Sequence, residues 1–243
     1  IAQVIRLARV YGQLGNIYLR IRNLQNALEM YKHQSLYGKK SNNISNELDG
    51  LFKQAECVAK LNDRQLSIEM VLQCEELYRN YGLKSDADAC LKTLANFYTL
   101  QKDYKNARKY FELYEKYSGL VDDNYYIQPI RNREYYYLSK GNFYNGIGKV
   151  DSALLFYYRL YAVEDNLCKQ TASRSLYLAY KKNGKKDSVI KYQTKYINYI
   201  RNSNKEQQTS QLQELQSYFD ITTERERAKR EADRATKNQH LMW

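Results

Sequence analysis

One residue pattern occurs three times along the chain with the same internal spacing. A small residue is followed after three positions by an aromatic residue, nine positions later by alanine, and four positions later by a second aromatic residue. Residues three or four positions apart share one face of a helix, so each copy predicts two helices that meet through small residues. The copies are Gly15, Tyr18, Ala27 and Tyr31; Ala95, Tyr98, Ala107 and Phe111; and Gly141, Tyr144, Ala153 and Tyr157.

Two weaker copies complete the series, one with Ser67 and one with Val189 at the alanine position. Such units bury their apolar faces against their neighbours and form an open-ended stack. With one proline and ten glycines in 243 residues, the sequence favours helices over a turn-rich β fold. The sequence therefore predicts an all-α stack of about five helical hairpins.

This pattern resembles the tetratricopeptide repeat (TPR) family over roughly residues 8–202. The resemblance implies a right-handed superhelical stack in an array spanning 1–202. The family's usual proline near the end of each repeat is absent, and we expect Ser85, followed by Asp88, to cap the third repeat. The approximate repeats are 8–41, 48–81, 88–121, 134–167 and 170–203.

Residues 203–243 differ in composition from the repeats. Leu212, Leu215 and Phe219 predict a capping helix that covers the last apolar face, and the charged run at 224–231 predicts a connector helix, through which the chain could form a homodimer. This order resembles the sensor half of bacterial membrane-anchored regulators, whose TPR domain is extracytoplasmic. The resemblance implies a membrane anchor beyond Trp243 and a kinase or DNA-binding output. The alternative is a soluble cytoplasmic adaptor.

Motifs for catalysis, cofactors and metals are missing from the sequence. The four cysteines have no metal-ligand spacing, and the Gly-x4-Gly run within residues 141–148 is followed by Ile147, where a phosphate-binding loop needs lysine. We therefore expect no catalytic residue, no cofactor and no metal site, and a binding protein in place of an enzyme.

Candidate binding residues come from the first helix of each hairpin, which lines the concave groove in TPR proteins. Asn16, Asn96 and Asn142 occupy one repeat position, where they form a ladder for a peptide backbone or are merely tolerated on the surface. Lys92 precedes Asn96 by one turn, and this pair resembles the TPR carboxylate clamp. Arg174 occupies the position of Lys92 in the last repeat, and Arg20 adds positive charge to the groove. The expected ligand is a protein or peptide, preferentially acidic.

A second candidate surface is basic. The net charge is +12, and the fifth repeat contributes the four lysines Lys181, Lys182, Lys185 and Lys186. They favour either a solvated face or binding to nucleic acid or another anionic surface. Nucleic acid is the less favoured partner, because the sequence has no nucleic-acid-binding motif.

Overall fold

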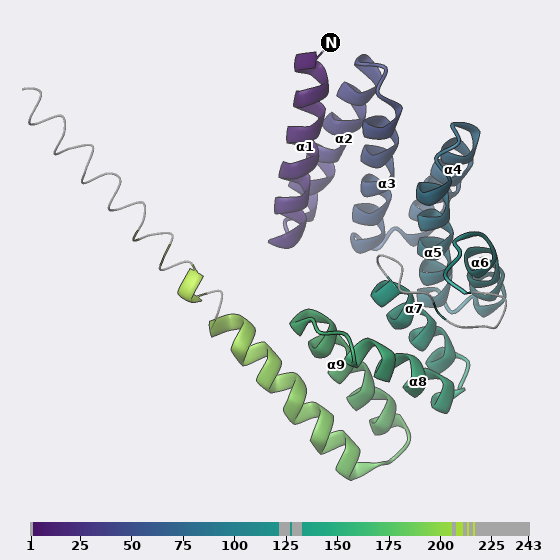
Figure 1. The fold of residues 1–243 in the computed structure, drawn as a ribbon, viewed down its shortest axis with the longest axis vertical. Helices are drawn as coiled ribbons and strands as arrows, with labels where there is room; N and C mark the ends of the chain where they lie inside the picture. The colour runs from purple at the N-terminus through teal and green to yellow at the C-terminus, as the bar shows by residue number, and fades with distance from the viewer. Residues whose placement is uncertain are drawn as a thin grey trace, which may run out of the picture. The chain divides into compact units, whose positions relative to one another are not determined.

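The computed structural model describes residues 2–121, 127, 133–205, 208–210, 213 and 216 (Figure 1). Apart from an isolated bridge between Val121 and Ile127, these residues form helices and the turns between them. A further helix occupies residues 186–205. The other helices are α1 (Ala2–Arg20), α2 (Leu24–Lys40), α3 (Ile44–Lys60), α4 (Arg64–Asn80), α5 (Lys84–Leu100), α6 (Tyr104–Tyr117), α7 (Arg133–Gly146), α8 (Val150–Tyr161) and α9 (Asn166–Lys182).

Consecutive helices pair as hairpins, which confirms the predicted all-α stack of helical repeats. We call the first helix of each pair helix A and the second helix B. The chain divides into two compact units, residues 1–160 and 161–243, and each is described by itself. The expected capping helix with Leu212, Leu215 and Phe219, and the charged connector, lie outside the described residues.

Short turns of one type connect successive helices from α1 to α6. A residue with positive φ recurs every 20 positions, from Arg22 through Gly82 to Lys102, and ends each helix. At most of these turns the following Asn or Asp caps the next helix by accepting a hydrogen bond from the backbone N–H three residues later. The expected cap at Ser85 is wrong, because α5 already begins at Lys84 after Leu83, without a side-chain cap.

The repeat pattern has a direct steric meaning. A Cβ atom at Gly15 would lie 2.5 Å from the ring of Tyr31, and one at Gly141 would lie 2.5 Å from the ring of Tyr157. The small residue of helix A thus makes room for the helix B aromatic of the same hairpin. Both contacts join repeat positions that the sequence pattern had paired.

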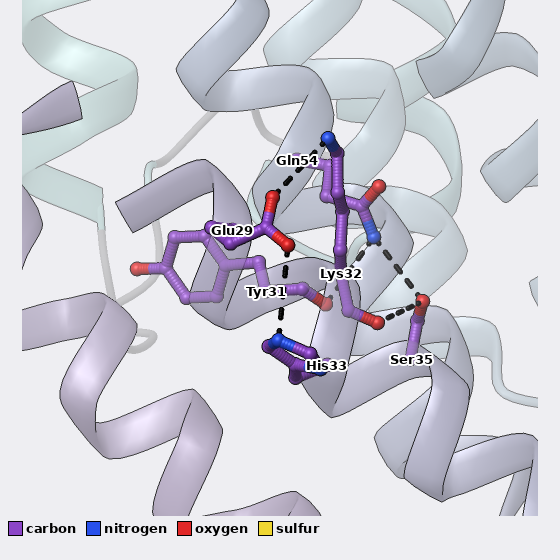
Figure 2. A network of polar contacts seen from close by, with 6 residues as sticks. All are labelled: Glu29, Tyr31, Lys32, His33, Ser35 and Gln54. Atoms are coloured by element: carbon purple, nitrogen blue, oxygen red, sulfur yellow. Dashed lines mark hydrogen bonds and ion pairs between the residues drawn. The ribbon is translucent and has the colours of Figure 1, made fainter. Parts of the chain in front are cut away.

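The first two hairpins meet where α2 crosses α3. A Cβ atom at Gly38 would lie 2.4 Å from the backbone nitrogen of Glu47, so the two backbones are in contact there. Further along α3, the buried Gln54 donates from Nε2 to the carbonyl of Tyr31 and to the hydroxyl of Ser35, each at 3.2 Å (Figure 2). Small residues and one buried amide therefore set the distance between these hairpins.

The fourth hairpin is joined to the third by an aromatic cluster that contains the ion pair of a buried lysine. Lys140 on α7 is 8% exposed and bonds to Glu115 of α6. The hydroxyl of Tyr136 donates to the same carboxylate at 2.7 Å, and the Lys140 Nζ lies 4.6 Å from the ring centroid of Phe111. Lys140 occupies the repeat position of Leu14 and Leu94, so this hairpin replaces an apolar contact with an ion pair.

The second unit holds α9 and helix 186–205. Tyr192 stacks on Tyr180 with ring centroids 5.8 Å apart, and Lys195 donates to the hydroxyl of Tyr161 at 2.8 Å. This fifth hairpin is therefore closed by aromatic packing between its two helices.

Candidate binding site

A pocket of about 420 Å³ opens on the helix A face of the first unit. We call it the Lys92 pocket. Three successive A helices line it, so its surface continues across the second, third and fourth hairpins. Its residues are Phe52, Lys53 and Glu56 on α3; Ala89, Lys92 and Thr93 on α5; and Glu134 and Tyr135 on α7.

The repeat explains why a hollow forms at this place. The middle helix, α5, contributes the small residues Ala89 and Thr93, whereas the flanking helices contribute the aromatic rings of Phe52 and Tyr135. Two large walls with a small residue between them leave a space that the hairpins do not fill themselves. An aromatic-walled pocket with a few charged groups is typical of a ligand site.

Lys92 is the more deeply buried of the two lysines that line this pocket. The residue is only 9% exposed, and its Nζ lies 5.0 Å from the ring centroid of Tyr135 and 5.8 Å from that of Tyr114. It makes no ion pair with a described residue. Burial lowers the pKa of Lys92, and this effect exceeds the opposing influence of Glu56 and Glu134.

The acidic groups of the pocket have other partners. Glu56 pairs with Lys53 at 2.9 Å, and Glu134 pairs with Arg133 at 3.8 Å. Burial lowers the pKa of Lys53, but the Glu56 carboxylate more than offsets this and holds it above its ordinary value. Lys92 is therefore a desolvated cation whose ring contacts replace only part of its lost hydration.

The three asparagines at the shared repeat position have different contacts. The amide oxygen of Asn16 accepts from Tyr31 at 2.8 Å, and that of Asn142 accepts from Tyr157 at 2.9 Å. The third hairpin has phenylalanine at the equivalent helix B position, so Asn96 finds no hydroxyl there. Its Nδ2 instead donates to the hydroxyl of Tyr135 at 3.0 Å, which fixes one wall of the pocket.

The remaining candidate residues lie outside the Lys92 pocket. Arg20 shares with Asn16 a shallow depression of about 640 Å³ along α1, which Gln13, Ile17 and Leu19 also line. Arg174 is exposed on α9 in the second unit. The four lysines of the basic patch are exposed around the turn at Gly184, where φ is +69°.

The sequence interpretation missed the residues that surround Lys92. Phe52 could have been found, since it occupies in the second hairpin the position that Lys92 occupies in the third. Tyr135 occupies the position of Ala89 in the fourth hairpin and could have been found in the same way. The pairing of Lys53 with Glu56 could also have been found, because opposite charges three residues apart share one face of a helix.

The described part of the chain shows no group of three or more His, Cys, Asp or Glu side chains placed to hold a metal ion. Among the same residues, no helix combines the length and the apolar character needed to cross a bilayer.

Comparison with known proteins relates the chain to others through its fold. No protein-family model and no curated protein matches the sequence. The chain is similar to a Podosopora anserina kinesin light chain structure of nearly identical TPR-like repeats, with a TM-score of 0.55, 15% identity, and coverage of 82% of this chain and 97% of that chain. It is also similar to BtubC from P. vanneervenii, with a TM-score of 0.59, 13% identity, and coverage of 84% and 83%. The chain therefore has the fold of TPR-like repeat proteins.

Proposed function

We propose that the chain is a non-enzymatic binding domain that holds a protein or peptide segment along its A helices, with an acidic group of the ligand on Lys92. The observation that carries this proposal is the buried Lys92, which has no ion pair with a described residue and lies in a pocket shared by three hairpins. A desolvated cation reduces stability unless it is paired. A ligand carboxylate would supply that pair.

The neighbouring groups indicate how such a ligand would be held. The rings of Phe52 and Tyr135 line the same pocket and suit an apolar side chain next to the acidic group. Asn96 contributes by holding Tyr135 and not through a second bond to the carboxylate. A charge-assisted hydrogen bond to Lys92 contributes about 1.5–3 kcal/mol, so the remaining affinity comes from contacts along the A helices.

A peptide-library selection tests this function. Random peptides with free C-termini and with blocked C-termini are selected on the wild-type chain, on Lys92→Met and on the control Lys105→Met, which changes an exposed lysine of α6. We expect acidic side chains or free carboxylates to be enriched on the wild type and the control and lost on Lys92→Met. Equal acidic enrichment on Lys92→Met would refute the proposal.

We also propose that the array is the sensor or scaffold part of a larger bacterial signalling or transcription-regulating protein. The support is the charged run at 224–231 after the repeats, which has the composition of an exposed connector helix. Labelling of single cysteines in intact cells, placed on exposed repeat positions of the full-length protein, tests the extracytoplasmic arrangement. Protection from a membrane-impermeant reagent would favour the adaptor function instead.

Binding to nucleic acid or another anionic surface is a second candidate function. It is favoured by the exposure of Lys181, Lys182, Lys185 and Lys186 around one turn. Such binding weakens steeply with added salt. Replacing these four lysines with glutamine should abolish it, whereas retained binding would exclude this surface.

A further inference from the structure

A lysine and two tyrosine hydroxyls meet in the second unit. Lys195 donates from Nζ to the hydroxyl of Tyr161 at 2.8 Å, and the hydroxyl of Tyr199 lies 3.4 Å from the same oxygen. Lys195 and Tyr199 are four residues apart on helix 186–205, so they share one face of that helix. All three side chains are half-buried, and we call them the Tyr161 cluster.

Aromatic packing holds this cluster in place. The ring of Tyr161 lies edge-on to Tyr192, with ring centroids 6.2 Å apart, and Tyr192 stacks on Tyr180. The Lys195 Nζ lies 4.8 Å from the ring centroid of Tyr161 and 5.9 Å from that of Tyr192. The packing of the hairpin therefore positions the polar groups before any ligand arrives, which reduces the entropy cost of binding.

The Tyr161 cluster has more donors than acceptors. Tyr199 keeps its proton, because its hydrogen bond to Tyr161 and its burial raise its pKa to about 12. The Tyr161 oxygen thus accepts from both Lys195 and Tyr199. Two N–H groups of Lys195 and the O–H of Tyr161 remain, and the described residues offer them no acceptor. Three unused donors at one place favour a ligand rich in acceptor oxygens.

The charge around the cluster is positive. Residues 161–205 contain ten lysine and arginine residues and three acidic ones, and no ion pair joins Lys195 to any of these acids. Burial raises the pKa of Tyr161, but the hydrogen bonds from Lys195 and Tyr199 more than offset this and hold it below its ordinary value. The charge of Lys169 acts in the same direction. The surroundings of the Tyr161 oxygen therefore stabilise negative charge.

We propose that the Tyr161 cluster binds a phosphate-monoester group. Such a group carries a charge of about −1.5 to −2 at neutral pH and has three strong acceptor oxygens, one for each unused donor. A carboxylate has a single charge and two oxygens, so it matches the cluster less well. The site lies within the second unit, apart from the Lys92 pocket and from the four lysines of the basic patch. It does not depend on the proposed function.

Three probes test the chemistry of the ligand. A short phosphoserine peptide, the same peptide with glutamate at that position, and inorganic phosphate are each titrated against the whole chain by calorimetry. We expect the phosphoserine peptide to bind roughly tenfold more tightly than the glutamate peptide, because only the phosphate supplies an acceptor for each donor. Equal affinities of the two peptides would overturn the proposal. Inorganic phosphate that binds as tightly as the phosphopeptide would identify the free ion as the ligand of the same site.

Matched variants locate the binding. Lys195→Met and Tyr161→Phe should each weaken binding of the phosphopeptide roughly tenfold, since each removes a hydrogen bond to a charged group. The controls Lys186→Met and Tyr196→Phe make the same changes elsewhere in the hairpin and should leave the affinity within about twofold of the wild type. Equal losses for Lys195→Met and Lys186→Met would show attraction by net charge alone, which contradicts a specific site.

The ionisation of Tyr161 provides a readout at the site itself. The ultraviolet absorbance of phenolate is followed against pH, and the difference between the wild type and Tyr161→Phe isolates this residue. We expect inorganic phosphate, but not chloride at the same ionic strength, to move the ionisation of Tyr161 to higher pH, because a bound anion disfavours the phenolate. Phosphate that binds without this change would occupy another place and refute the assignment. Lys92→Met should change neither affinity nor ionisation, so the two sites are tested separately.

Discussion

Lys92→Met should stabilise the free protein while it removes ligand binding. Methionine keeps most of the volume of the buried stem but carries no charge to desolvate. The loss of the cation's contact with the Tyr135 ring, 5.0 Å from Nζ, costs about 0.5–1 kcal/mol and offsets part of the gain. We expect a net gain of about 1 kcal/mol in the free energy of unfolding, within the usual range for a single stabilising substitution.

Thermal unfolding measures this gain. About 1 kcal/mol raises the Tm of a chain of this size by about 2–4 °C. The exposed control Lys105→Met should leave the Tm unchanged. A Tm below that of the wild type would show that Lys92 stabilises the fold, which contradicts its interpretation as a desolvated binding group.

The pH dependence provides a second test of the same variant. In the unfolded chain Lys92 keeps its proton up to its ordinary pKa of 10.5, whereas burial lowers the pKa in the folded protein. Between these two values folding releases the proton, and the free-energy cost of that release falls as the pH rises toward 10.5. The Tm difference between Lys92→Met and the wild type should therefore be largest below the folded-state pKa of Lys92 and shrink as the pH approaches 10.5. A difference that is independent of pH would exclude the charge as its cause.

The remaining predictions concern the packing between hairpins. Gly38→Ala should lower the free energy of unfolding, measured in urea, by about 3 kcal/mol, because the new Cβ would lie 2.4 Å from a backbone atom of α3. A decrease below about 1 kcal/mol would show that the helices can separate freely. Asn142→Ala should lower the free energy of unfolding by about 1 kcal/mol, because the Tyr157 hydroxyl loses its hydrogen-bond acceptor. The peptides selected should stay the same, and a change in them would assign Asn142 to the ligand surface. Glu115→Gln should lower the free energy of unfolding by about 3 kcal/mol, because Lys140 stays buried without its counterion. Lys140→Leu should lower it by less, and a larger decrease for Lys140→Leu than for Glu115→Gln would contradict the packing described.

The fold was predictable because the repeat pattern encodes contacts within each hairpin. Gly15 lies against the ring of Tyr31, and Gly141 lies against the ring of Tyr157, so neither position has room for a side chain. The two members of each pair are separated by the same number of residues in the sequence. The 40-residue period follows from helices of 17 residues joined by short turns, as in α2 and α3. The cap of α5 was not predictable, because Ser85 looks like a capping residue while the turn at Gly82 already starts the helix.

The surroundings of Lys92 were harder to predict, because they come from three hairpins. Tyr135 on α7 follows its repeat equivalent Ala89 by 46 residues and not by 40, so its place beside Lys92 depends on the longer connection before α7. The ion pair of Lys140 with Glu115 also joins two hairpins. Sequence spacing within one repeat contains no information on such contacts.

The most direct test of the proposed function is a double-mutant cycle between Lys92 and the ligand's acidic group. An acidic peptide from the selection and its amide analogue are each titrated against the wild type and Lys92→Met by calorimetry. We expect a coupling free energy of about 1.5–3 kcal/mol, the contribution of a hydrogen bond to a charged group. A coupling energy near zero, with the acidic peptide still bound by Lys92→Met, would show that the buried lysine does not receive the ligand's acidic group.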